Sequence, residues 1–130
     1  MKLSADERDA LVSYRIQKAN DTLKEAEGIS SLGYWNAVAN RLYYACYYAT
    51  SALLIKNSFQ AQTHRGVITL LGMHFIKTGK ISENSGKLFS RLFELRQTGD
   101  YDDLFDLTEE DVQPLLKPAK EYIKEISNLL

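Results

Sequence analysis

The 130-residue chain has one cysteine and two prolines, and both shortages limit its structure. The single cysteine, Cys46, excludes an intramolecular disulfide, and its place in an apolar run favours a buried thiol in a reducing compartment. Scarce proline leaves room for long helices, since an interior proline costs a helix about 3 kcal/mol. The composition, 45% hydrophobic and 25% charged, is typical of a folded protein, and we expect one domain over residues 1–130.

The sequence also lacks a long uninterrupted apolar run. Its first ten residues have no apolar core of the kind that a secretory signal needs. The longest apolar stretch, residues 35–55, is interrupted by polar residues such as Asn40 and Arg41 and is too polar to span a membrane. We therefore expect no membrane association and a cytoplasmic location.

Motifs for metal or cofactor binding are missing as well. One cysteine and two histidines do not have the spacing of metal ligands, and there is no Glu-x-x-His pair. Neither standard glycine-rich phosphate loop is present. We expect no metal and no cofactor, and no complete catalytic signature is visible.

Charge is small in sum but uneven along the chain. The net charge is −1, which by itself does not suggest a nucleic-acid binder, and we expect no DNA partner. Residues 41–96 carry eight lysines or arginines against two acids, whereas residues 100–111 carry seven acids and no base. This asymmetry predicts either partner surfaces or merely unequal solvated helix faces.

Apolar spacing predicts an all-α protein, an antiparallel four- to five-helix bundle. The first helix is expected over residues 5–27, with Ser4 and Glu7 as a capping box, and Gly28 and Gly33 bracketing a break. The second is expected over 34–56 and the third over 63–78, ending at Gly79. A fourth begins after Ser82 and ends at Gly99, and a fifth begins after Thr108 and is kinked or delayed by Pro118.

The predicted helix 34–56 is apolar on nearly every side. Such a helix lies at the centre of a bundle, or it is shared between the core and a second copy, and we expect a homodimer through it. Asn36, Asn40, Tyr44, Tyr47 and Ser51 form one semi-polar stripe along it. These groups either hydrogen-bond within the bundle or lie in a dimer interface, where tyrosine is enriched.

Two cationic positions stand at predicted helix ends. His64 and Arg65 open the third helix, where the positive end of the helix dipole favours an anion, although a capping turn with a solvated arginine is the alternative. Arg96 lies near the end of the fourth helix, where a cation is expected on dipole grounds alone.

Several segments together resemble the HEPN domain family. The segment Gly33-Tyr34-Trp35-Asn36-Ala37-Val38-Ala39-Asn40-Arg41-Leu42-Tyr43-Tyr44-Ala45 is similar to the family's second helix. His64-x-Gly66 followed by Phe75 and Gly79, and Leu95-Arg96 followed by Asp100-Tyr101, are similar to its later helices. The resemblance covers nearly the whole chain and implies a helical bundle that commonly forms homodimers and often acts with a nucleotidyltransferase as toxin and antitoxin.

Several members of that family are metal-independent ribonucleases with an arginine followed, after four to six residues, by histidine. Arg96 matches the arginine, but Tyr101, Asp102 and Asp103 stand at the histidine positions. A tyrosine is a poor proton acceptor at pH 7, and aspartates repel RNA phosphate. The resemblance implies catalytic positions at Arg96 and Tyr101. Nucleotide- or RNA-binding positions are expected at Asn40, Arg41, Tyr44, His64, Arg65 and Asp100.

Three hypotheses follow from these observations. The chain is a homodimeric module that pairs with a nucleotidyltransferase and binds nucleotide or RNA, or it is a ribonuclease toxin with an altered site at Arg96. The third hypothesis is a dimeric scaffold without a ligand. The sequence alone does not decide between them.

Overall fold

Helices are the only regular elements in the computed structural model, which describes residues 2–104 and 106–130. This confirms the predicted all-α fold. The elements, in chain order, are α1 (Ala5–Ser30), α2 (Trp35–Lys56), α3 (His64–Leu71), a π-helical turn (Gly72–Ile76), α4 (Glu83–Tyr101), α5 (Glu109–Val112), a 3₁₀ turn (Gln113–Leu115) and α6 (Leu116–Ser127).

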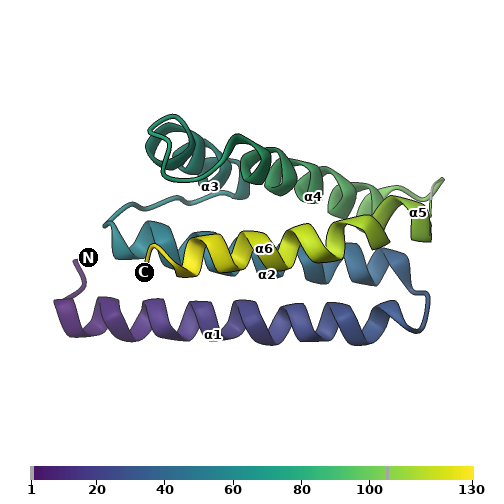
Figure 1. Ribbon diagram of the computed structural model, residues 1–130, viewed down its shortest axis with the longest axis horizontal. Helices are drawn as coiled ribbons and strands as arrows, with labels where there is room; N and C mark the ends of the chain where they lie inside the picture. Colours follow the sequence, from purple (N-terminus) through teal and green to yellow (C-terminus); the bar gives the residue numbers. More distant parts are fainter. Residues whose placement is uncertain (1, 105) are drawn as a thin grey trace.

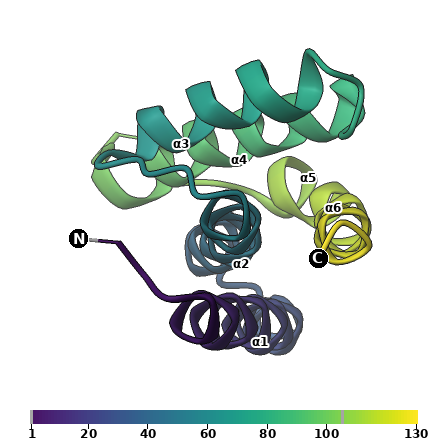
Figure 2. The same cartoon turned by 90° about the vertical axis from the view of Figure 1, so that its left-hand side faces the viewer.

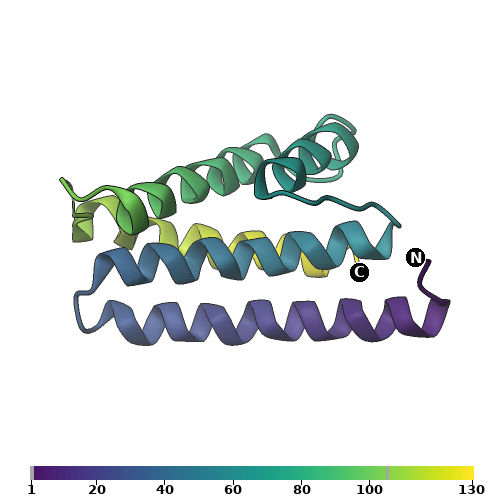
Figure 3. The same cartoon turned by 180° about the vertical axis from the view of Figure 1, so that it is seen from behind.

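The long helix α2 lies at the centre of the bundle. Helix α1 runs along one side of it in the opposite direction, and α3 and α4 cover the other side (Figures 1 and 3). Seen along its length, α2 also has α6 beside it (Figure 2). The first of the two expectations for this helix, a central place, is therefore confirmed, and α2 needs no second copy to cover most of its apolar surface.

The first helix extends three residues beyond the predicted end at residue 27. Gly28 was expected to lie at a break, but it is helical, and the hydroxyls of Ser30 and Ser31 donate to the carbonyls of Glu27 and Gly28. These bonds satisfy carbonyls that a helix end leaves free. Gly33, with a φ of 77°, makes the turn into α2. The predicted capping box of Ser4 and Glu7 is present.

The third predicted helix is divided into α3 and the π-helical turn, in which the Lys77 N–H donates to the Gly72 carbonyl. Gly79 has the predicted left-handed conformation, with a φ of 80°. In the last region, a 3₁₀ turn separates α5 from α6, so that Pro118 falls in the first turn of α6 where no N–H is needed. The predicted delay of this helix is confirmed.

The prediction that α4 ends at Gly99 is wrong, because the helix continues to Tyr101. Gly99 instead permits a close approach of the acidic connector, the segment that leads from α4 to α5. A Cβ atom at this position would lie 3.1 Å from Leu107 Cδ1 and 3.4 Å from Asn36 Oδ1. The glycine is therefore needed for packing against the connector rather than for a left-handed helix end.

The core contains a column of aromatic rings between α2, α4 and α6. Phe89 stacks on Tyr43 and on Tyr122, at centroid distances of 5.6 and 5.7 Å, and all three side chains are fully buried. The Tyr122 hydroxyl hydrogen-bonds Thr50 Oγ1 at 2.6 Å. In the described part of the chain, no helix is long and apolar enough to cross a membrane.

Candidate functional site

The semi-polar stripe of α2 is incompletely covered by the other helices. All five stripe residues are partly exposed. Asn36 binds the connector: its amide donates to Asp106 Oδ1, and its carbonyl oxygen accepts from the Leu107 N–H. Asn40 and Tyr44 contact the end of α4, and Tyr47 contacts the start of α3. Four of the five stripe residues thus contact α3, α4 or the segment that follows α4, in one row along α2.

Arg96 lies at the centre of this row. Its guanidinium group is within 5.1 to 5.7 Å of the ring centroids of Tyr43, Tyr44 and Tyr101, and the residue is only 6% exposed. One nitrogen donates to the Tyr44 hydroxyl at 3.2 Å, but the buried Nε has no hydrogen-bond partner among the described residues. The nearest carboxylate, that of Asp100, is 3.7 Å away. The positive charge is therefore cradled by aromatic rings and only partly neutralised.

A chain of polar side chains connects Arg96 to the surface. Asp100 accepts a hydrogen bond of 2.9 Å from the Asn40 amide. The Asn40 oxygen in turn accepts from two nitrogens of Arg41, at 3.0 and 2.8 Å. Arg41 is partly exposed, and its ion pair with Glu25 is long, at 3.9 Å. Two arginines consequently flank Asn40 and Asp100, with more exposed positive charge at Arg41.

His64, the first residue of α3, lies on the other side of the same tyrosines. Its ring stacks on Tyr47 at 4.6 Å and meets Tyr44 edge-on at 5.9 Å. Its Nδ1 atom is 2.6 Å from the Tyr43 hydroxyl oxygen. Burial, and then the charge of Arg96, lower the pKa of His64 below its ordinary value near 6.5, so the ring is neutral at pH 7.

The Tyr43 contact also decides which nitrogen of His64 carries the proton. Burial raises the pKa of Tyr43, so its hydroxyl stays protonated, and Nδ1 of His64 is the hydrogen-bond partner that the structure gives this hydroxyl. We assign the hydroxyl as the donor to Nδ1, because the structure gives this buried hydroxyl no other acceptor among the described residues, and this assignment places the proton of the neutral ring on Nε2. His64 thus offers a hydrogen-bond donor at Nε2 rather than a proton acceptor.

We expect the imidazole of His64 to titrate below pH 6.5 with its neutral proton on Nε2, as measured by ¹⁵N NMR of the ring. Because the folded pKa is lowered, the unfolded chain binds the proton more tightly, and stability falls as pH drops from about 6.5 through the folded value. The unfolded protein in denaturant serves as the reference. In Tyr43→Phe the preference for Nε2 should weaken, and a proton on Nδ1 in the unaltered protein would contradict this assignment.

The structure brings together most of the predicted site residues. Arg96, Asn40, Arg41, Tyr44 and Asp100 are joined by the contacts above, and the ring of exposed Tyr101 lies against Arg96. Arg65 is the exception, because its guanidinium group lies over Phe93, at 5.3 Å, without a contact to these groups among the described residues. The two aspartates Asp102 and Asp103 are exposed beyond the helix end.

Sequence reasoning missed the role of Tyr43. This fully buried tyrosine touches both Arg96 and His64 and thereby links the two cationic positions. The available signal was a hydroxyl on an otherwise apolar side of the helix, since a buried tyrosine hydroxyl generally needs a partner. Nothing in the sequence named His64 as that partner, because the two residues are on different helices.

Known proteins resemble this chain over most of its length. A family model described as HEPN domain matches residues 12–129. A UPF0332 protein of Thermotoga maritima is 32% identical over 96% of this chain and 95% of its own length. A Methanocaldococcus jannaschii protein named Putative toxin MJ0142 is 25% identical over 88% of this chain and 78% of its own.

The solved structure of TT1696 from Thermus thermophilus has the same fold, with a TM-score of 0.77 at 17% identity. The match covers 92% of this chain and 98% of the TT1696 chain. The sequence and its relatives thus agree that this chain belongs to the HEPN domain family.

Proposed function

We propose that this chain is a toxin-type HEPN module that binds RNA or a nucleotide through a phosphate at the Arg96 cluster, meaning Arg96, Asn40, Arg41, Tyr44 and His64. The observation that carries the proposal is the state of Arg96, a buried cation with an unpartnered Nε among the described residues and a carboxylate no nearer than 3.7 Å. A phosphate oxygen is a strong acceptor for such a guanidinium group.

Other groups around Arg96 fit a nucleic-acid strand. His64 offers an Nε2–H donor, Arg41 supplies exposed positive charge, and the exposed ring of Tyr101 is available for stacking on a base. Cations and rings continue onto α1, where Lys18 lies 5.1 Å from the ring centroid of Tyr48. Interleaved cations and aromatic rings are typical of surfaces that bind single strands without strong sequence preference.

Cleavage of RNA is the second candidate, and the tautomer of His64 weighs against it. A general base must take a proton from the attacking hydroxyl onto a free nitrogen lone pair. With Nδ1 assigned as the acceptor of the Tyr43 hydroxyl, Nε2 carries the proton, and His64 donates rather than accepts. Incubation with labelled RNA in the absence of metal tests this point, and cleavage that is lost in His64→Ala would replace the binding proposal by the ribonuclease.

The experiment for the binding proposal is fluorescence anisotropy with labelled single-stranded RNA and with ATP, at several salt concentrations. We expect Arg96→Gln and Arg41→Gln each to weaken binding about 10-fold, and each to reduce the salt dependence. Asp100→Asn should strengthen binding several-fold, because it removes the carboxylate that competes with phosphate for Arg96.

Arg91→Gln is the matched control, since Arg91 is an exposed arginine of the same helix, paired with Glu94 at 3.8 Å. Its binding should stay within about twofold of the unaltered protein, in keeping with a surface ion pair. Equal weakening by all three arginine substitutions would mean only nonspecific attraction, and no effect of Arg96→Gln would refute the proposed site.

Homodimerisation and a nucleotidyltransferase partner belong to the same proposal. The half-buried aromatic residues Tyr44, Tyr47 and Tyr48 of α2 are the surface that suits a second copy, while the acidic residues 100–111 suit a basic partner. Light scattering is expected to give twice the chain mass of 14.8 kDa. A single-chain mass at micromolar concentration would remove the dimer from the proposal.

A further inference from the structure

A cavity lies beside the Arg96 cluster, on the side of α2 away from α6. Figure 2 shows the chain before α1 and the chain between α2 and α3 passing on this same side of α2. Between them is a cavity of about 760 Å³, lined by α1, the second half of α2 and the segment before α3. This volume is in the range of small-molecule sites. Tyr47, which also stacks on His64, separates the cavity from the Arg96 cluster.

One wall of this cavity is positively charged. Lys2, Arg8 and Arg15 line it, and no acidic residue does. None of the ion pairs formed within residues 2–104 and 106–130 involves these three side chains. Arg15 is partly buried, and its Nε is completely enclosed without a hydrogen-bond partner in that part of the chain. An enclosed donor without an acceptor is costly and indicates a missing partner.

Another part of the lining is apolar. Leu54 and Ile55 of α2, with Phe59 and Val67, form it, and Phe59 is held in place by the His74 ring at a centroid distance of 4.2 Å. Polar groups of Ser51, Ser58 and Gln60 also line the cavity. A lining that combines cations with aromatic and aliphatic side chains suits a molecule that has an anionic end and a ring.

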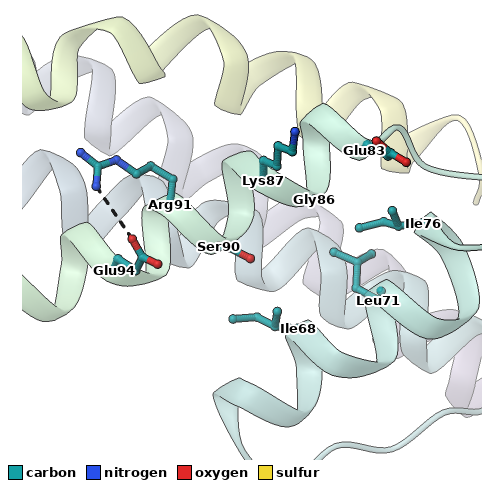
Figure 4. A pocket seen from close by; sticks show the side chains of 10 residues that line it. Ile68, Leu71, Ile76, Glu83, Gly86, Lys87, Ser90, Arg91 and Glu94 are labelled. Atoms are coloured by element: carbon teal, nitrogen blue, oxygen red, sulfur yellow. Dashed lines mark ion pairs between the residues drawn. The ribbon is translucent and has the colours of Figure 1, made fainter.

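A cavity between α3 and α4 provides a contrast. It measures about 670 Å³, with Ile68, Leu71 and Ile76 at its apolar side (Figure 4). Its two cations are matched by two acids, and one pair, Arg91 and Glu94, is drawn in contact (Figure 4). Unbalanced positive charge is therefore a property of the Arg15 cavity in particular.

We propose that the Arg15 cavity binds a small phosphorylated molecule that carries an aromatic ring. Arg15 and Arg8 hold the phosphate, whose oxygens accept the hydrogen bond that Arg15 Nε lacks among the described residues, together with bonds from Arg8, which otherwise donates one long bond of 3.5 Å to the Leu3 carbonyl. The ring packs against Phe59 and Ile55. This site is separate from the Arg96 cluster and does not depend on RNA binding there.

Calorimetry with phenyl phosphate, inorganic phosphate and phenol tests the two halves of this site. Phenyl phosphate should bind at least about 10-fold more tightly than inorganic phosphate, and phenol should not bind measurably. Arg15→Gln and Arg8→Gln should each weaken phenyl phosphate binding about 10-fold, while Arg91→Gln and Arg96→Gln leave it within twofold. Arg8 lies near the start of α1 and is partly exposed, so its variant remains informative if Arg15→Gln does not fold.

The outcomes separate this site from the proposed RNA site. Binding of phenyl phosphate that persists in Arg96→Gln, and is not displaced by RNA, supports the second site. Absence of phenyl phosphate binding at millimolar concentration overturns it. Binding that is lost in Arg96→Gln but retained in the folded Arg8→Gln variant also overturns it, since the ligand would then occupy the Arg96 cluster.

Discussion

Replacing Tyr43 by alanine is expected to lower the free energy of unfolding by about 3–5 kcal/mol, the range for removing a large buried ring. The side chain is fully buried and stacks on Phe89, while Phe93 meets it edge-on at 5.7 Å. Its loss also leaves Arg96 without the ring at 5.1 Å. Denaturant unfolding followed by circular dichroism measures the change.

Tyr43→Phe is the matched control, because it keeps the ring and removes only the hydroxyl. Its cost should be about 1 kcal/mol or less, the net contribution of a typical hydrogen bond. A loss in Tyr43→Phe as large as that in Tyr43→Ala would mean that the hydrogen bond to His64, rather than the aromatic column, stabilises this region.

The second large effect concerns the buried pair of Thr50 and Tyr122. We expect the loss in the free energy of unfolding to depend on which of the two residues is substituted. Thr50 Oγ1 donates to the Cys46 carbonyl at 2.7 Å, so the Tyr122 hydroxyl donates to Thr50. Thr50→Val leaves the Tyr122 hydroxyl buried without an acceptor, and we expect a loss of about 1–3 kcal/mol in the free energy of unfolding.

The substitution of the other partner, Tyr122→Phe, is the comparison for Thr50→Val. Tyr122→Phe leaves the Thr50 hydroxyl with its bond to the Cys46 carbonyl, and its cost should be about 1 kcal/mol or less. The two variants remove the same hydrogen bond, so thermal and denaturant unfolding of both, side by side, measure the penalty of the orphaned group. Equal losses would contradict the donor assignment.

The order of the helical segments and most helix starts could be predicted because their causes are local. Ser4, Ser82 and Thr108 cap the helices that follow them, and apolar spacing marks the faces. The helix end predicted at Gly99 was wrong because a glycine is found in two situations. It can adopt the left-handed conformation that ends a helix, or it can allow another segment to pack closely against the helix. Only the folded connector at Leu107 shows that the second applies here.

The same holds for the candidate site: features with local causes could be predicted from the sequence, and features with long-range causes could not. The stripe on α2 could be recognised because its members are three or four residues apart on one helix. The Arg15 cavity could not be recognised in this way. Arg8 and Arg15 are 51 and 44 positions from Phe59 in the sequence, and they meet it only through the packing of α1 on α2. Unpaired charge at such a place depends on where the acids of other helices lie.

Because of its position, Cys46 can report the transient opening of the helical bundle. It is the only cysteine of the sequence, it is fully buried at the centre of α2, and burial raises the pKa of its thiol. A thiol reagent reaches it only when the helices around α2 separate, so the rate of modification follows the population of open molecules. A ligand that binds only the closed form slows that rate by the factor that its concentration and affinity dictate. One unlabelled side chain can thus rank ligands and variants without any assay of activity.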